Sequence, residues 1–226
     1  MKRIHHTLVS DGISDANLIP IIDWTLKRVA GVALTQGVRA EFWRFPTKPE
    51  GLSEKIIQAI EHYPCDVLFV HRDAERQQPK ERIEEIQNAL ATANLHGVRV
   101  PAVAVVPVRM LEAWLCFNEV AIRKAAGNPN GKQPLGLPDH KRVEARPDPK
   151  NDLKKALLAA SELRGRRLKK FNTAAAFWRI VDYIDDFSPL CQLPAYRAFE
   201  LAVGRMKQSG WRPGFHGDPI YDIDSL

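Results

Sequence analysis

The sequence lacks long apolar runs. No stretch of about eighteen consecutive uncharged apolar residues occurs, and such a stretch is what a membrane-spanning helix requires. The first residues, Met1 to His6, also lack the apolar core of a signal peptide. We therefore expect a protein that does not cross a membrane and that resides in the cytoplasm.

Cysteine is scarce and scattered. The three cysteines, Cys65, Cys116 and Cys191, lie far apart and form no CxxC pair, which argues against a zinc knuckle or a disulfide framework. The nucleotide-binding pattern GxxxxGK[ST] is absent from the sequence, so any ATP hydrolysis must come from another chain. What is present is an ordinary globular composition, 45% hydrophobic and 27% charged, in 226 residues, enough to bury a core without covalent cross-links.

The first half of the chain alternates apolar, strand-like segments with segments of helical periodicity. The pattern predicts strands over residues 3–10, 38–45, 66–71 and 102–106. Helices are predicted from Ser14 up to a stop at Gly37, over residues 52–62 and 79–96, and from Met110 onward. Repeated strand–helix–strand units with right-handed crossovers give an α/β fold whose parallel sheet of about four strands carries helices on both faces.

The character of the sequence changes after Gly127. Residues 128–149 contain five prolines, which predicts a long irregular excursion. Helices are predicted over residues 151–163, 173–185 and 195–207, followed by an irregular end over 210–226. We therefore predict an α/β domain over residues 1–127, and a basic loop with a helical C-terminal extension packed on it over residues 128–226.

Positive charge is concentrated in the middle of the chain. Between Val120 and Lys170 there are 14 Lys and Arg against 5 Asp and Glu, although the formal charge of the whole chain is only +6. Such an excess is typical of a surface that meets phosphates or another anionic partner, and equally of a solvated basic helix without a role. Both interpretations remain open at this point.

Acidic residues follow three of the predicted strands: Asp11 after the first, Asp73 and Glu75 after the third, and Glu112 after the fourth. Loops at the carboxyl ends of parallel strands converge, so these carboxylates are expected to approach one another. Crowded carboxylates repel, and a hard divalent cation relieves that repulsion. Taken singly, each acid is equally typical of a turn or a helix start, and a Rossmann-like domain without metal remains possible.

These motifs resemble a known family. The segment Ser10-Asp11-Gly12-Ile13-Ser14-Asp15 is similar to the Val-Glu-Gly-x-Ser-Asp opening of the Toprim-like DUF4276 proteins, small bacterial proteins related to Toprim nucleases. Asp73 and Glu75 correspond to their acidic pair, and Glu112-Ala113-Trp114 and Pro149-Lys150 match two further motifs. The resemblance covers most of residues 7 to 205. One departure is that Asp11 stands where the family has glutamate, with a carboxylate one methylene shorter.

The resemblance implies a divalent-metal-dependent nuclease that acts on DNA or RNA, in phage defence, with an AAA- or ABC-type ATPase as a possible partner. Mg²⁺ or Mn²⁺ would be held by Asp11, Asp73 and Glu75, and Glu112 would complete the catalytic set. The residues expected to bind phosphate are Arg142, Arg146, Lys150 and Lys154. The alternative is a non-catalytic interaction or effector subunit that works through a partner protein.

Overall fold

The computed structural model describes residues 3–209, and the predicted irregular end over 210–226 lies outside the described residues. The chain forms two compact units. One, here called the sheet unit, contains the chain up to Val106 and again from Pro194; the other, the helical unit, runs from Pro107 to Leu193. The division therefore differs from the predicted boundary at residue 127, because the segment after the fourth strand already belongs to the helical unit. Within residues 3–209, no helix combines the length and the hydropathy needed to cross a bilayer.

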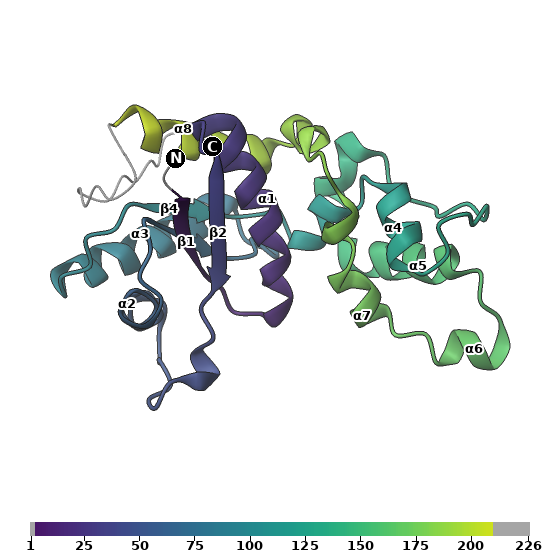
Figure 1. Cartoon of the computed structure of the whole chain (residues 1–226), viewed down its shortest axis with the longest axis horizontal. Helices are drawn as coiled ribbons and strands as arrows, with labels where there is room; N and C mark the ends of the chain where they lie inside the picture. The colour runs from purple at the N-terminus through teal and green to yellow at the C-terminus, as the bar shows by residue number, and fades with distance from the viewer. Residues whose placement is uncertain (1–2, 210–226) are drawn as a thin grey trace. The chain divides into compact units, whose positions relative to one another are not determined.

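The sheet unit alternates strands and helices (Figure 1). Short 3₁₀ or π turns between them are named η here. Its elements are β1 (Arg3–Val9), η1 (Ile13–Asn17), α1 (Leu18–Thr25), η2 (Leu26–Ala30), β2 (Leu34–Arg39), η3 (Phe42–Arg44), α2 (Leu52–His62), β3 (Val67–His71), α3 (Pro79–Leu95), β4 (Ala102–Val105) and α8 (Pro194–Gln208). The four strands form one sheet in the order β2-β1-β3-β4, and every pair is parallel. This confirms the predicted α/β class, a Rossmann-like sheet of four strands flanked by helices.

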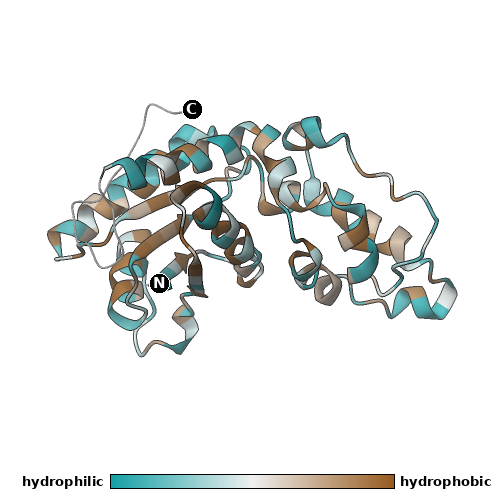
Figure 2. Cartoon of the chain, turned by 45° about the horizontal axis from the view of Figure 1, so that its top comes forward, coloured by the Kyte–Doolittle hydropathy of each residue, from teal (hydrophilic) through white to brown (hydrophobic). Residues whose placement is uncertain are grey.

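Both faces of the sheet are covered, which explains why the inner strand β3 is buried along its whole length (Figure 2). Leu68 and Val70 of β3 belong to a core cluster with residues of α2 and α3. Phe69, between them in sequence, faces the opposite side, where its ring lies 6.1 Å from that of Phe199 in α8 and packs edge-on. Successive strand residues alternate sides, so a continuous apolar run marks a strand buried on both.

The second strand begins and ends earlier than the predicted range of 38–45. Gly37 was expected to end a helix but lies inside β2, where an added Cβ would stand 2.6 Å from both His6 Nε2 and Ile19 Cγ2. The preceding helical segment ends instead at Gly31, in the left-handed conformation. Phe42 and Phe45, which produced the apparent alternation, pack against each other in a turn with ring centroids 5.6 Å apart.

The helical unit consists of short helices. Its elements are η4 (Leu111–Leu115), α4 (Glu119–Ala125), η5 (His140–Ala145), α5 (Pro149–Ser161), α6 (Gly165–Lys169), α7 (Thr173–Trp178), η6 (Val181–Tyr183) and η7 (Ser188–Gln192). The helix predicted over 173–185 is shorter than expected, and α6 was not predicted. Asp148 caps α5 by accepting a hydrogen bond from the Asn151 amide, and Pro149 occupies the first turn, where its missing N–H is harmless.

Candidate functional site

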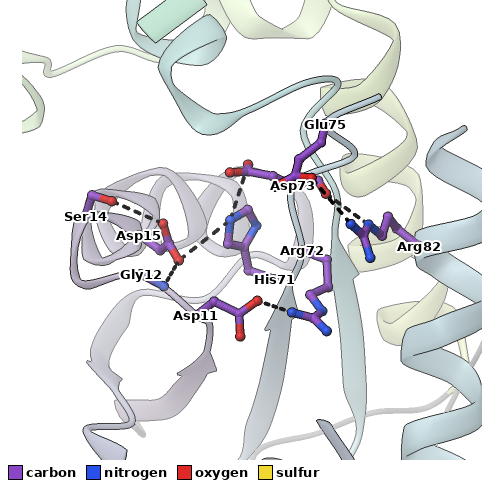
Figure 3. A pocket seen from close by; sticks show the side chains of 9 residues that line it. All are labelled: Asp11, Gly12, Ser14, Asp15, His71, Arg72, Asp73, Glu75 and Arg82. Atoms are coloured by element: carbon purple, nitrogen blue, oxygen red, sulfur yellow. Dashed lines mark hydrogen bonds and ion pairs between the residues drawn. The ribbon is translucent and has the colours of Figure 1, made fainter. Parts of the chain in front are cut away.

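A polar pocket lies at the carboxyl edge of the sheet, between β1 and β3. β2 lies on the outer side of β1, and β4 lies on the outer side of β3, so the strand order reverses between β1 and β3. Ligands of open parallel sheets bind at such a reversal point. Val9 and Val70 pair across β1 and β3, so the loops that follow them are neighbours. The cavity measures about 230 Å³ (Figure 3). Its lining, here called the strand-end pocket, consists of Asp11, Gly12, Ser14, Asp15, His71, Arg72, Asp73, Glu75 and Arg82.

Asp11 lines the pocket, but the negative charge of its carboxylate is already compensated by two cations. One oxygen accepts a hydrogen bond of 2.6 Å from Lys55 Nζ, and the other is paired with the Arg72 guanidinium. Burial acts to raise the pKa of Asp11, but the hydrogen bond from Lys55 and the charge of Arg72 outweigh it and hold that pKa below its usual value. The carboxylate therefore stays ionised, with two cations as its partners.

Glu75 is also directed to a cation. Its side chain is 68% exposed, and Oε2 lies 3.8 Å from an Arg82 nitrogen. Glu75 has the left-handed φ of 53°, an uncommon conformation for a residue that is not glycine. Arg82 also donates to Glu85 Oε2 at 2.8 Å and to the Asp73 carbonyl at 3.2 Å, so it joins α3 to the loop after β3.

Three other side chains converge in the same pocket. His71, the last residue of β3, is buried, with Nε2 3.5 Å from Asp73 Oδ1 and 3.9 Å from Asp15 Oδ2 (Figure 3). Asp15 is only 7% exposed and accepts a 2.7 Å hydrogen bond from the Gly12 amide. Burial lowers the pKa of His71, although the charge of Asp15 opposes that shift, so the ring is neutral near pH 7.

The predicted metal ligands do not fit a metal site as a set. The structure places Asp11, Asp73 and Glu75 in one pocket, as the sequence predicted, but two of the three carboxylates face cations rather than each other. Within residues 3–209, no group of three or more His, Cys, Asp or Glu side chains is placed to hold a metal ion. No catalytic step is therefore derived from a metal held by Asp11, Asp73 and Glu75.

Glu112 belongs to the helical unit and is 8% exposed. Its Oε1 lies 4.0 Å from Lys150 Nζ, so two of the predicted site residues are neighbours there. The adjacent Trp114 is fully buried, and its indole N–H donates to Glu144 at 3.2 Å. The Glu-Ala-Trp motif thus has a packing role, since Trp114 ties η4 to η5, and the catalytic role of Glu112 stays a prediction.

The predicted phosphate-binding residues differ in their availability. Arg146 is engaged by Asp152, with Nε–Oδ2 and Nη2–Oδ1 distances of 2.7 and 3.1 Å. The hydrogen bond from Arg146 lowers the pKa of Asp152, as expected of a charged pair. Lys150 is 73% exposed beside Glu112, and Arg142 and Lys154 are exposed.

A second basic group stands out in the helical unit. Residues 164–170, here called the α6 basic segment, contain five exposed cations in seven residues. These are Arg164, Arg166, Arg167, Lys169 and Lys170. No carboxylate among the described residues forms a salt bridge with any of them, and no residue of α6 is buried. Elsewhere in the cationic stretch from Val120 to Lys170, Arg123, Arg146 and Lys150 do pair with carboxylates.

The sequence interpretation missed Asp15, His71, Arg72 and Arg82 as pocket residues. Asp15 was explained as an ordinary helix-start acid, and it does bind the Gly12 amide in that way. The overlooked signal was His71, because a histidine that ends a fully buried strand must place its ring at the sheet edge. No family model, curated protein or solved structure matches this chain, so the DUF4276 resemblance stays a prediction.

Proposed function

We propose that the strand-end pocket is the active site of a phosphodiesterase that cleaves nucleic acid in the cytoplasm. The observation that carries this proposal is the pocket itself. It lies at the reversal point of a parallel sheet and combines carboxylates and a neutral imidazole with two guanidinium groups. Carboxylates can orient a water that attacks phosphorus, and guanidiniums can bind the phosphoryl oxygens.

Nucleic acid as the substrate is supported by the α6 basic segment. Cations without acidic partners attract a polyanion, because each phosphate that they neutralise releases bound counterions. The reaction is a hydrolysis at phosphorus: the water oxygen forms a new P–O bond, the P–O bond to the leaving oxygen breaks, and a proton lost by the water is balanced by one that the leaving oxygen takes up. Mg²⁺ or Mn²⁺ is an expectation of the sequence resemblance, and no step of the proposed reaction depends on it.

Cleavage assays on plasmid, single-stranded DNA and RNA, with Mg²⁺ or Mn²⁺, test the proposal. Asp73→Asn should lower the rate at least about 100-fold, because a pocket carboxylate is lost from the reaction. Glu61→Gln is the matched control, since it removes one exposed carboxylate from the end of α2 and should leave the rate unchanged. Equal rates for the wild type and Asp73→Asn would refute this active site.

A second candidate function is a non-catalytic effector subunit that acts through a partner, including an AAA- or ABC-type ATPase in phage defence. It is favoured by one observation: Asp11, at the position of the family glutamate, is paired with Lys55 and Arg72. A carboxylate held by two cations is a poor proton acceptor. Absence of cleavage on every substrate, with binding retained, would favour this function.

A further inference from the structure

The turn η3, which follows β2, holds a tryptophan in water at the carboxyl edge of the sheet (Figure 1). Trp43, in the middle of this turn, is 72% exposed, although aromatic side chains usually bury much of their area. The rings on either side of it are anchored. Phe42 and Phe45 pack edge-on with ring centroids 5.6 Å apart, and the Phe45 ring lies 4.4 Å from that of His62 at the end of α2. The exposed indole therefore projects from a turn that its neighbours hold in place.

Arg44 covers one face of the Trp43 ring. Its guanidinium carbon lies 4.9 Å from the ring centroid, and the guanidinium is also paired with Glu41. A ring that is 72% exposed with a guanidinium over one face presents its other face to water. Flat aromatic faces of this kind, with an arginine beside them, are the surfaces on which proteins stack the bases of single-stranded nucleic acid.

This turn adjoins the strand-end pocket. The Ala40 amide donates to a carbonyl of β1 at 2.9 Å, so the chain leaves β2 beside the end of β1. Lys55 of α2 contacts both places: its Nζ lies 5.8 Å from the centroid of the Phe42 ring and donates to Asp11 at 2.6 Å. One side chain thus connects the turn that carries Trp43 to the lining of the pocket.

Apolar surface also borders the pocket directly. Ile13 lies between Gly12 and Ser14, two residues of the pocket lining, and is itself 65% exposed. A ligand that extends along this edge would meet guanidinium groups inside the pocket and apolar surface outside it. A nucleic acid strand, in which flat apolar bases alternate with negative phosphates, has this combination of groups. In a duplex the bases stack on one another, so an indole can stack only on an unpaired base.

We propose that Trp43, with Arg44 over its ring, is a stacking site for an unpaired nucleobase, which makes single-stranded nucleic acid the substrate class of the strand-end pocket. A base held on the indole leaves the phosphates of the same strand to the guanidinium groups of the pocket. This inference deepens the proposed function, on which it rests for the role of the pocket. It adds a preference for single strands, which the exposed cations of the α6 basic segment do not supply, because they attract phosphates of any strand.

Fluorescence anisotropy with three labelled probes separates stacking from charge in the full-length protein. The probes are a thymidine strand of about 15 nucleotides, an abasic strand of the same length with the same phosphates, and a duplex of that length. Trp43→Ala should weaken binding of the thymidine strand about tenfold, because the stack on one base is lost. Its affinity for the abasic strand and for the duplex should stay within about twofold of the wild type.

Two further variants control this measurement. Trp43→Phe keeps an aromatic face and should retain most of the affinity for the thymidine strand. The strand should quench part of the tryptophan fluorescence of the wild type, and that quenching should be lost in Trp43→Phe. Leu95→Ala removes an 88% exposed apolar side chain from the end of α3, at the opposite edge of the sheet, and should bind all three probes as the wild type does.

Several outcomes would overturn the proposal. It fails if Trp43→Ala binds the thymidine strand as tightly as the wild type, or if the wild type binds the abasic strand equally well. Quenching by vesicles of phosphatidylserine and phosphatidylcholine, without quenching by the strand, would assign the indole to a membrane surface instead. Urea unfolding verifies that Trp43→Ala is folded, and the quenching lost in Trp43→Phe decides the matter if it is not. Stacking without cleavage would refute only the proposed activity, whereas cleavage with unchanged binding by Trp43→Ala would refute only the stacking site.

Discussion

The strand-end pocket and the α6 basic segment are both rich in charge, but they differ in how that charge is compensated. In the pocket, Arg72 is shared between Asp11 and Glu85, and Arg82 between Glu85, Glu75 and the Asp73 carbonyl. In the α6 basic segment, none of the five cations is paired with a described carboxylate. The pocket is therefore a fixed arrangement of charges, and the segment is a source of positive potential.

This difference suggests a division of roles. Charges held by partners keep their positions, which is what a site needs to orient a reacting group. Unpaired, solvated cations hold no particular geometry, but they attract an anionic chain of any sequence. We therefore expect substitutions in the α6 basic segment to change affinity alone, and substitutions in the pocket to change stability as well.

The largest effect is expected for the triple variant Arg164→Ala, Arg166→Ala and Arg167→Ala. If each arginine binds one phosphate of duplex DNA, the slope of log affinity against log salt concentration should become less steep by about 2.7. The affinity near 0.1 M salt should decrease by roughly 100-fold or more. Fluorescence anisotropy over a salt series measures both quantities. The free energy of unfolding should stay within about 0.5 kcal/mol, because the side chains are exposed.

A control for this variant removes the same charge from the sheet unit. Lys27, Arg99 and Lys207 are exposed cations, and their joint replacement by Ala also lowers the net charge by three. If that control weakened binding as much as the α6 variant, net charge alone would explain the effect. The comparison between the two regions would then be wrong.

A smaller effect, on stability, is expected for Arg72→Ala. The substitution removes a guanidinium that pairs with both Asp11 and Glu85, and it leaves two carboxylates without that partner. Unfolding in urea should show a loss of about 1–3 kcal/mol, the range for hydrogen bonds to charged groups. Arg167→Ala in α6 is the matched control and should cost less than about 0.5 kcal/mol. Equal losses for the two variants would remove the distinction between paired and unpaired cations.

The smallest effect concerns the pH dependence contributed by Asp11. Its pKa is lowered in the folded protein by Lys55 and Arg72 against the opposing effect of burial, so ionised Asp11 stabilises the fold above its unfolded pKa of about 3.8. As the pH falls through the lower, folded pKa, that stabilisation is lost. Half of the side chain is exposed and screened by water, so the contribution is about 0.5–1 kcal/mol.

Urea unfolding of Asp11→Asn at several pH values tests this expectation. The variant should be less stable than the wild type at pH 6–7, and the difference should shrink below about pH 4. Asp185→Asn, which removes an exposed carboxylate from the helical unit, is the control. A difference for Asp11→Asn that does not change with pH would show that the ion pairs with Lys55 and Arg72 do not stabilise the fold.

The sequence by itself determined the fold class and the location of the pocket. Continuous apolar strands separated by helical periodicity imply a parallel sheet, and residues that follow β1 and β3 must then meet at one edge. Asp11, Asp73 and Glu75 were placed in one pocket for this reason. Local patterns were less reliable where packing competed with them, as directly after β2, where Phe42 and Phe45 form a turn in place of a strand.

Only the tertiary structure decided which carboxylates face a cation and which face His71. The order of the strands predicts which loops are neighbours. It does not predict which ion pairs form, because these depend on the direction of each side chain and on cations from distant elements. Lys55 comes from α2 and Arg82 from α3, and neither follows from the motifs after the strands. The Val105 carbonyl that orients His71 lies 34 residues along the chain. Charge compensation is therefore a property of the packed molecule, because it depends on cations that distant elements supply.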